Sequence, residues 1–298
     1  MSSLDWVFLL VLSLIWGGGF VLNDIAVQEL PPATLVFVRL ALAALVLVPI
    51  VRAMGYRLPT SRAHWRDFAV MAVLNNVVPF TLIAQGQTEI TAGLTSVLNA
   101  TSPLFAIIVA ALFGGSGRPP ARSWIGIVLG IAGVAVLVGP EAILGNDTHV
   151  GAMLMILCAS LCYGFSALWG RRFAGVPPLV AAASQLIASA VILVPVALVL
   201  DRPWTLEVPG VATWQAVGVL ALFSTALAYV LFFRVMASSG GVNVMLVTLL
   251  IPPSAILLGH VFLAEPIVMR QIIGAAIITL ALIVIDGRLV AALLDRRA

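Results

Sequence analysis

Charge is the scarcest property of this sequence. Only 9% of the 298 residues are charged, no lysine is present, and the 15 basic residues are all arginines. Soluble domains carry about 25% charged residues, so a chain that is 62% hydrophobic has too few charges to cover a soluble surface. The formal net charge of +3 comes without a basic stripe, which excludes a nucleic-acid binder. The high apolar content also excludes a disordered chain.

Cysteine and histidine are rare as well, with 2 and 3 residues. So few cysteines exclude a disulfide-rich secreted scaffold. Cys158 and Cys162 lie four residues apart without a histidine or acid beside them, so we expect no metal site there. The glycine-rich stretch 114–117 joins two apolar segments and is interpreted as a linker rather than a phosphate loop. We therefore expect no cofactor and no enzyme activity, and the sequence offers no nucleotide-binding domain, which excludes direct use of ATP by this chain.

Long hydrophobic runs fill the rest of the chain, whose mean hydropathy is +1.17. They show no period of two, which excludes the short alternating strands of a β-barrel, and ten membrane-spanning helices of about 20 residues each account for the apolar excess. The first run has no basic region before it and no cleavage site after it, so we expect a retained helix rather than a signal peptide. The ten predicted helices cover approximately 4–23, 33–51, 67–85, 93–113, 124–140, 150–170, 179–200, 212–233, 242–263 and 271–285.

The arginines predict the orientation of these helices. With the N-terminus inside, the outer loops contain only Arg202 and Arg270, while Arg39 lies within the second helix. This asymmetry on short loops follows the positive-inside rule, so both termini are expected in the cytoplasm. The twelve arginines assigned to the cytoplasmic side are Arg52, Arg57, Arg62, Arg66, Arg118, Arg122, Arg171, Arg172, Arg234, Arg288, Arg296 and Arg297.

The two halves of the chain repeat each other. Pro31-Pro32 recurs 146 positions later as Pro177-Pro178, and Ser13 to Gly17 is echoed by Ser160 to Gly164. Each half holds five predicted helices. Because five is odd, the second copy must enter the membrane from the opposite side. This is an inverted-topology repeat, as in many secondary transporters.

Several of these residues resemble the EamA family of the drug/metabolite transporter superfamily. They are Trp16-Gly17, Pro31-Pro32 followed by Arg39, Ser102-Pro103, and Ala264-Glu265-Pro266 before Arg270. The resemblance implies two EamA-like repeats, at 4–140 and 150–286, with a cytoplasmic tail at 287–298. It also implies export of small metabolites, and the chain is most similar to bacterial exporters of aromatic amino acids. Two departures from the family pattern are Gly114-Gly115-Ser116-Gly117 and Gln185, which stands where the first half has Arg39.

Polar and aromatic residues near the middle of the predicted helices define a candidate substrate site. Polar groups at this depth must face protein or water, and Asn75-Asn76 and Ser224-Thr225 occupy equivalent positions in the two repeats, 149 residues apart. Interhelical hydrogen bonds by the asparagines and core packing by Trp16 are the alternative interpretations. The predicted substrate-binding residues are Trp16, Asn75, Asn76, Pro79, Phe80, Asn99, Tyr163, Ser224, Thr225 and Tyr229.

Few charged groups lie near this site. Arg39 is expected to reach the outer face and pair with Asp24 or Glu29, and the alternative is that it attracts a substrate carboxylate. His260 is the remaining titratable candidate, and Glu265 is expected to be an interfacial cap.

Four prolines and three glycines are expected to shape the helices. Pro79, Pro103, Pro252 and Pro253 are expected to interrupt the third, fourth and ninth helices. Gly126, Gly130 and Gly133 permit close packing of the fifth helix, either within one chain or between two chains.

The sequence therefore predicts a multi-pass protein of the bacterial inner membrane. Its expected function is to export small metabolites, such as aromatic or other apolar amino acids, by alternating access without ATP. The alternatives are a drug or other metabolite carrier, and a membrane-embedded enzyme. The only expected partners are the small-molecule substrate and the lipid bilayer. The oligomeric state stays open, and a monomer is consistent with the sequence.

Overall fold

The computed structural model describes residues 2–114, 120–143, 149–244 and 246–287, and these residues form helices and loops without a strand. Residues 288–298 of the predicted tail at 287–298 and most of the glycine-rich linker lie outside the described residues. The elements in chain order are α1 (Ser3–Val27), α2 (Pro32–Ala53), α3 (Arg62–Ala72), η1 (Val73–Val77), α4 (Val78–Gly86), α5 (Ala92–Asn99), α6 (Ser102–Phe113), α7 (Ala121–Ile143), α8 (Val150–Trp169), η2 (Gly170–Phe173), α9 (Pro178–Leu200), η3 (Pro203–Thr205), α10 (Val211–Ala221), η4 (Leu222–Leu227), α11 (Ala228–Ser239), α12 (Gly241–Val244), α13 (Val247–Leu263) and α14 (Met269–Asp286).

The all-helical membrane architecture predicted from the sequence is confirmed. Eight helical stretches in the described residues are long and apolar enough to cross a membrane, and two shorter apolar helices, Val247–Leu263 and Met269–Ile285, follow them. These stretches overlap the ten apolar segments of the sequence. Large apolar side chains cover the outside of the bundle, among them Leu45, Val128 and Val199, which are 70%, 66% and 71% exposed. Such a surface is suited to lipid.

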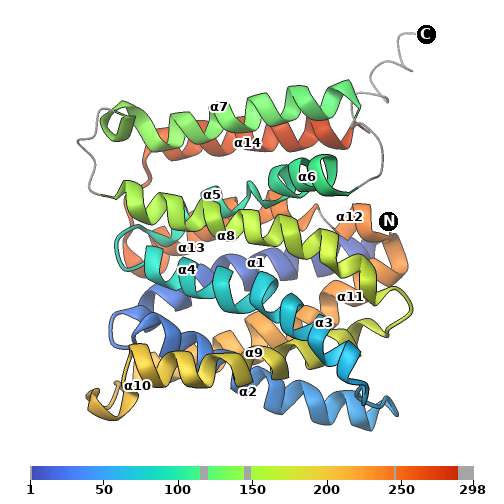
Figure 1. Cartoon of the computed structure of the whole chain (residues 1–298). Helices are drawn as coiled ribbons and strands as arrows, with labels where there is room; N and C mark the ends of the chain where they lie inside the picture. Colours follow the sequence, from blue (N-terminus) through green and yellow to red (C-terminus); the bar gives the residue numbers. More distant parts are fainter. Residues whose placement is uncertain (1, 115–119, 144–148, 245, 288–298) are drawn as a thin grey trace.

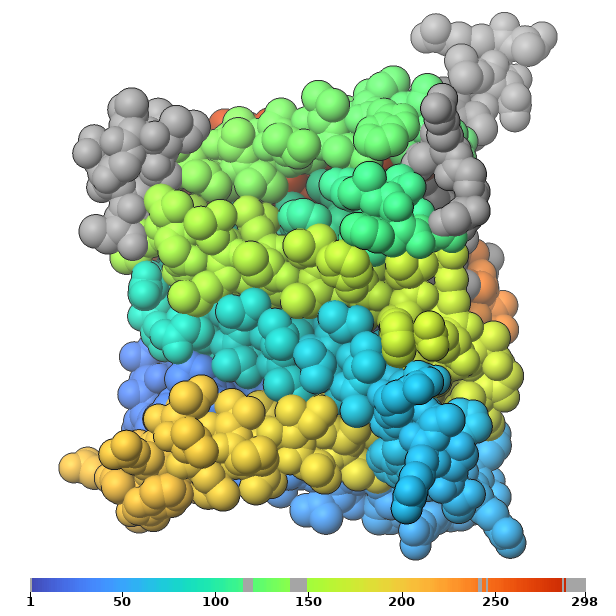
Figure 2. Space-filling model, viewed as in Figure 1, coloured from blue at the N-terminus to red at the C-terminus, as the bar shows by residue number. Residues whose placement is uncertain are grey.

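The helices pack side by side in one bundle (Figure 1). The α7–α14 pair lies at one edge of it, and α2, α9 and α10 gather at the opposite edge. α14 packs on α7, α2 on α9, and α1 on α13. On the face of the molecule shown in Figure 2, α8 lies between α7 and α4.

Prolines start equivalent helices in the two halves. α2 begins at Pro32 and α9 at Pro178, each after a second proline in an extended conformation. Proline suits the first position of a helix because its fixed φ is already helical and its missing N–H has no partner there. The recurring proline pairs therefore mark the start of equivalent helices in the two halves.

Glycines allow equivalent close contacts in the two halves. A Cβ added at Gly17 of α1 would lie 2.8 Å from the Ser254 Cβ of α13, and one at Gly164 of α8 would lie 2.9 Å from the Phe105 carbonyl carbon of α6. Neither position has room for a side chain, so Gly17 and Gly164 let these helix pairs approach closely.

The glycines of α7 are used within the chain. A Cβ at Gly133 would lie 2.8 Å from Ile278 and 3.2 Å from the Gly274 carbonyl oxygen, both on α14. Gly126 faces Ile285 of the same helix, and Gly130 faces Leu104 of α6. Of the two interpretations left open by the sequence, the structure shows packing within one chain.

Two π-helical segments interrupt equivalent helices. η1 joins α3 to α4, and η4 joins α10 to α11. η1 contains Asn75-Asn76 and η4 contains Ser224-Thr225, the two polar pairs matched by the repeat. Short π-helical segments occur frequently at functional sites.

The expected proline breaks are found at two of the three helices. Pro79 stands just after η1, and Pro103 lies in the first turn of α6. The expectation for the ninth helix is wrong, because Pro252 and Pro253 lie inside the continuous helix α13. A proline is tolerated inside a membrane helix where neighbouring groups satisfy the freed backbone carbonyls.

Candidate functional site

A cavity of about 520 Å³ lies inside the bundle. Its volume is within the range of small-molecule sites, about 300–1,000 Å³. Both repeats contribute to its wall. The described lining residues are Trp16, Gly19, Phe20, Asn23, Arg39, Met71, Asn75, Phe80, Ile83, Gln87, Ser96, Asn99, Ala100, Ser102, Tyr163, Ser166, Ala167, Gly170, Gln185, Ser224, Thr225, Tyr229, Phe232, Phe233, Met236, Val247, Thr248 and Ile251.

The structure brings together eight of the ten residues predicted as substrate-binding. The eight that line the cavity are Trp16, Asn75, Phe80, Asn99, Tyr163, Ser224, Thr225 and Tyr229. Asn76 and Pro79 are buried and lie behind the lining. The Asn76 Nδ2 donates a 2.9 Å hydrogen bond to the Ser189 Oγ of α9, so Asn76 connects two helices.

The π-helical segments determine which residues face the cavity. In an α-helix, residues four apart share a face, which would place Asn76 beside Phe80. In a π-helix the backbone hydrogen bonds join residues five apart, so a turn takes more residues and the facing positions shift. Asn75 and Phe80, five apart, both line the cavity, as do Ser224 and Tyr229 in the second repeat.

Arg39 points to the cavity instead of the outer surface. Its Nε donates a 3.1 Å hydrogen bond to the Thr225 Oγ1, and its guanidinium carbon lies 4.5 Å from the centre of the Phe80 ring. Thr225 in turn donates to the Leu220 carbonyl oxygen at 2.9 Å. The expected pairing with Asp24 or Glu29 is wrong, because the threonine and the ring hold the guanidinium.

Gln185 occupies the position in α9 that corresponds to Arg39 in α2, and it contacts the other π-helical segment. Its Oε1 accepts from the Asn75 Nδ2 at 3.4 Å, and its Nε2 donates to the Tyr229 hydroxyl at 3.4 Å. Ser166 of α8 donates to the Asn75 Oδ1 at 3.2 Å. Arg39 and Gln185 therefore make related contacts across the two repeats, but only one of them is charged.

An aromatic contact connects α1 to the second repeat. The Trp16 Nε1 donates to the Ser224 carbonyl oxygen at 3.2 Å, and the Ser224 Oγ donates to the Ile15 carbonyl oxygen at 3.1 Å. The Trp16 ring centre is 5.7 Å from that of Phe232. These bonds fix the indole at the cavity wall, where it offers an apolar surface.

Asn99 of α5 places an unused acceptor in the wall of the cavity. Its Oδ1 is buried and has no hydrogen-bond partner among the described residues. A buried acceptor without a partner costs free energy. The cavity wall therefore contains a neutral acceptor at α5, buried in this conformation, as well as the guanidinium at α2.

A buried amide pair lines the cavity close to the loop that follows α4. The Asn23 Nδ2 donates to the Gln87 Oε1 at 2.9 Å, and the Gln87 Nε2 donates to the Phe20 carbonyl oxygen at 2.8 Å. The site predicted from the sequence omits both Asn23 and Gln87. Their polarity near the ends of apolar segments is the signal that identifies them.

Acidic residues of the connecting loops cap helices at this end of the bundle. The two Glu265 oxygens accept from the Ala92 and Gly93 amides of α5 at 2.7 and 3.1 Å. Asp201 accepts from the Thr34 amide of α2 at 2.6 Å. Glu265 is thus a cap, as expected from the sequence. Carboxylates suit helix N-termini because the free N–H groups and the helix dipole attract negative charge.

Glu29 makes the same kind of contact with the start of α10. It accepts from the Gly210 amide at 2.6 Å and from the Thr213 hydroxyl at 2.7 Å. The Thr213 hydroxyl, followed by the Gly210 amide, lowers the pKa of the Glu29 carboxyl below its ordinary value.

His260 is exposed and lies outside the cavity lining, with its Nδ1 2.9 Å from the Glu265 carbonyl oxygen.

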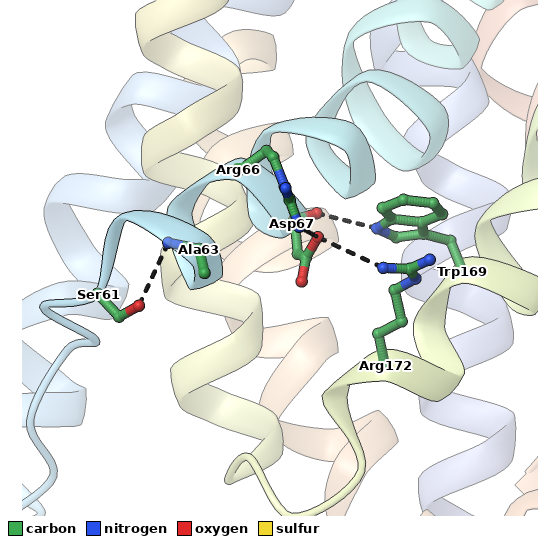
Figure 3. A network of polar contacts seen from close by, with 6 residues as sticks. All are labelled: Ser61, Ala63, Arg66, Asp67, Trp169 and Arg172. Atoms are coloured by element: carbon green, nitrogen blue, oxygen red, sulfur yellow. Dashed lines mark hydrogen bonds and ion pairs between the residues drawn. The ribbon is translucent and has the colours of Figure 1, made fainter.

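A polar network joins α3 to the end of α8 at the opposite end of the bundle (Figure 3). The Asp67 carbonyl oxygen accepts from the Trp169 Nε1 at 3.1 Å. Arg172 approaches the Asp67 carboxylate at 3.8 Å and covers the Trp169 ring at 4.0 Å. The cavity reaches this end, because Gly170 and Met236 are part of its lining.

The described residues contain no cluster of three or more histidine, cysteine, aspartate or glutamate side chains that would hold a metal. Arg39 alone carries a formal charge among the described lining residues. The cavity can therefore surround an apolar or aromatic molecule and hydrogen-bond to it from several helices.

Comparisons with known proteins agree with this architecture. The "Uncharacterized inner membrane transporter YedA" of Escherichia coli K12 is 30% identical over 224 residues, covering 74% of this chain and 70% of the relative. The "Uncharacterized transporter YoaV" of Bacillus subtilis is 23% identical over 267 residues, covering 89% and 91%. One solved structure, described as "Crystal structure of protein", shares the fold with a TM-score of 0.68 and 20% identity, covering 100% and 99% of the two chains.

The family comparison covers almost the whole chain. The sequence pattern of the EamA-like transporter family matches residues 5–139 and again residues 150–286. The two matches correspond to the two halves whose prolines, glycines and π-helical segments occupy equivalent positions. This chain is a membrane transporter that belongs to the EamA-like transporter family.

Proposed function

We propose that this protein exports small amphipathic metabolites, with aromatic and other apolar amino acids as the first candidates, across the inner membrane. The single observation that supports this most is the cavity shared by the two repeats, with aromatic walls and amide and hydroxyl groups from several helices. Such a lining matches a substrate with an apolar body and a polar group. A hydrated ion or a sugar phosphate would leave the aromatic wall unused.

Alternating access is the mechanism that fits this arrangement. The two halves make related contacts, so rocking one against the other gives inward and outward states of similar construction. The Asn23–Gln87 bond and the Glu265 cap lie at the end assigned to the outside, while Gly170 and Met236 extend the cavity toward the arginine-rich end. We assign the described conformation to the inward-facing state, in which a cytoplasmic substrate enters.

The driving force proposed is the substrate's own gradient, by facilitated diffusion or exchange. Proton-coupled carriers place a titratable group where substrate and proton both reach it. No aspartate, glutamate or histidine is among the described lining residues. In liposomes, a pH gradient or a membrane potential should not concentrate a neutral zwitterion. Accumulation that an uncoupler abolishes would contradict this mechanism.

The transport activity itself is tested by counterflow. The purified chain in liposomes loaded with one unlabelled amino acid should take up the same labelled amino acid transiently, with the largest signals for aromatic and apolar side chains. Protein-free liposomes are the control. If a drug panel gives counterflow and amino acids do not, the chain is a carrier of another substrate class. If no compound gives counterflow, the transport proposal fails.

A further inference from the structure

We propose that Arg39 is a carboxylate subsite, and that the substrate carboxylate, rather than its amino group, is the required recognition element. This inference rests on the proposed function and narrows its substrate class to acids with an apolar or aromatic body. Arg39 is half-buried at the cavity wall and makes no ion pair with a carboxylate of the described residues. A charge at this depth is costly unless it meets an opposite charge or water, and a bound carboxylate supplies the opposite charge.

The hydrogen bonds of Arg39 leave its guanidinium available. Its Nε is held by Thr225 at 3.1 Å and its flat face by Phe80 at 4.5 Å. These contacts fix the plane of the group, while its two terminal nitrogens make no hydrogen bond to the described residues. A guanidinium held in this way matches the two oxygens of a carboxylate with two parallel bonds.

The comparison between the repeats shows that the charge is not required for packing. Gln185 occupies the equivalent position in α9 and makes a related contact with the other π-helical segment, through Asn75. A neutral amide is therefore sufficient to join these elements. The positive charge is contributed by α2 of the first repeat and has no charged counterpart in α9, so an anionic group of a substrate is attracted to the α2 side of the cavity.

The remainder of the lining does not offer a charged partner for an amino group. No acidic side chain is among the described lining residues, and the free acceptor at Asn99 is a neutral amide oxygen. A substrate ammonium group is therefore tolerated but contributes less than the carboxylate, since charge-assisted pairs are the stronger ones. An acid without an amino group should bind at least as well as the amino acid.

The test uses two probes with the same ring and chain, 3-phenylpropionate and phenethylamine, and calorimetric titration of the purified full-length protein. The acid should bind the wild-type chain about tenfold or more tightly than the amine. R39Q should lose about tenfold or more in affinity for the acid, and R39K should retain part of it. R234Q is the matched control, because Arg234 also covers an aromatic ring, Phe8 at 5.5 Å, but lies outside the described lining.

One further variant keeps the result interpretable. T225V retains the charge but removes the Nε partner, so it should weaken acid binding less than R39Q does, and it replaces R39Q if that variant fails to fold. Equal binding of acid and amine to the wild type, no binding of the acid, or an acid affinity unchanged in R39Q and T225V would each overturn the subsite.

Failure of the subsite is distinguishable from failure of the transport proposal. If phenylalanine gives counterflow but 3-phenylpropionate does not compete, the carboxylate inference falls and transport stands. If the acid binds through Arg39 but no compound gives counterflow, the subsite stands and the transport function falls.

Discussion

Asn75 and Asn76 are adjacent in the sequence but have different roles in the structure. Asn75 lines the cavity and contacts Gln185 and Tyr229, while Asn76 is fully buried and bonds to Ser189. Both residues bond to α9, but only Asn75 also lines the cavity, where it can meet a substrate. Substitutions at Asn75 should therefore affect transport as well as stability, and substitutions at Asn76 mainly stability.

W16A and N75A should reduce transport strongly, because both side chains line the cavity, and each should also lose some thermal stability, because each makes hydrogen bonds to other helices. N76A should lower the free energy of unfolding by about 0.6–2 kcal/mol, since it removes one interhelical hydrogen bond. Counterflow and thermal unfolding in detergent measure the two effects, with lipid-facing L45A as the control. Normal transport by both W16A and N75A would show that the cavity is not the substrate site.

Eight residues of the cavity lining are predictable from the sequence, because a polar residue deep in an apolar helix is stable only where it faces protein or water. The sequence does not separate Asn75 from Asn76, since a helix with a four-residue repeat places Asn76, and not Asn75, beside Phe80. The π-helical register reverses that choice, and nothing in the local sequence indicates a π-helix. The local sequence also does not indicate whether the Arg39 side chain points to the cavity or to the outer surface, since its hydrogen-bond partner Thr225 is 186 residues away.

Among the helices, glycines in equivalent positions of the two halves allow close contacts. G17A and G164A should each lower stability, because the added Cβ would lie 2.8 and 2.9 Å from atoms of α13 and α6. G218A is the matched control, since nothing lies within 4 Å of a Cβ at that position of α10. Thermal unfolding in detergent measures the difference. A G17A variant as stable as G218A would contradict the close packing of α1 and α13.

The cap of α10 predicts a pH dependence. The pKa of Glu29 is lowered in the folded chain by Thr213 and Gly210, so its stabilising contribution is complete above the ordinary glutamate pKa of 4.5. It is lost as the pH falls below that value through the lower folded pKa. E29Q should therefore reduce the loss of stability between about pH 5 and acidic pH, relative to wild type. Identical pH profiles of thermal unfolding would contradict this role.

For the molecule as a whole, the arginine distribution and the fold predict one orientation. The end of the bundle that contains Arg171 and Arg172 should face the cytoplasm, and the end where Glu29, Asp201 and Glu265 cap helices should face outward. A reporter fused after Ala298, or within the 52–66 loop, should be cytoplasmic. A periplasmic reporter after Ala298 would contradict the predicted helix count and the inverted repeat that depends on it.

The large-scale architecture follows from the sequence more completely than the site does. Hydropathy locates the helical stretches, because lipid permits few alternatives to a helix, and the recurring prolines reveal the repeat. The α7–α14 edge is not predictable, since Gly126, Gly130 and Gly133 allow contacts within or between chains. Only the three-dimensional arrangement shows that α14 and α6 occupy these surfaces.

Cysteine accessibility tests whether the cavity opens alternately to the two sides of the membrane. Cys158 and Cys162 are first replaced by serine, and a single cysteine is introduced at Ser224 in the cavity or, as a control, at lipid-facing Leu45. A membrane-impermeant thiol reagent is then applied to oriented vesicles from either side. Alternating access predicts that S224C reacts from both sides, that substrate changes both rates, and that L45C reacts from neither. Reaction of S224C from one side only, with and without substrate, would rule out alternating access.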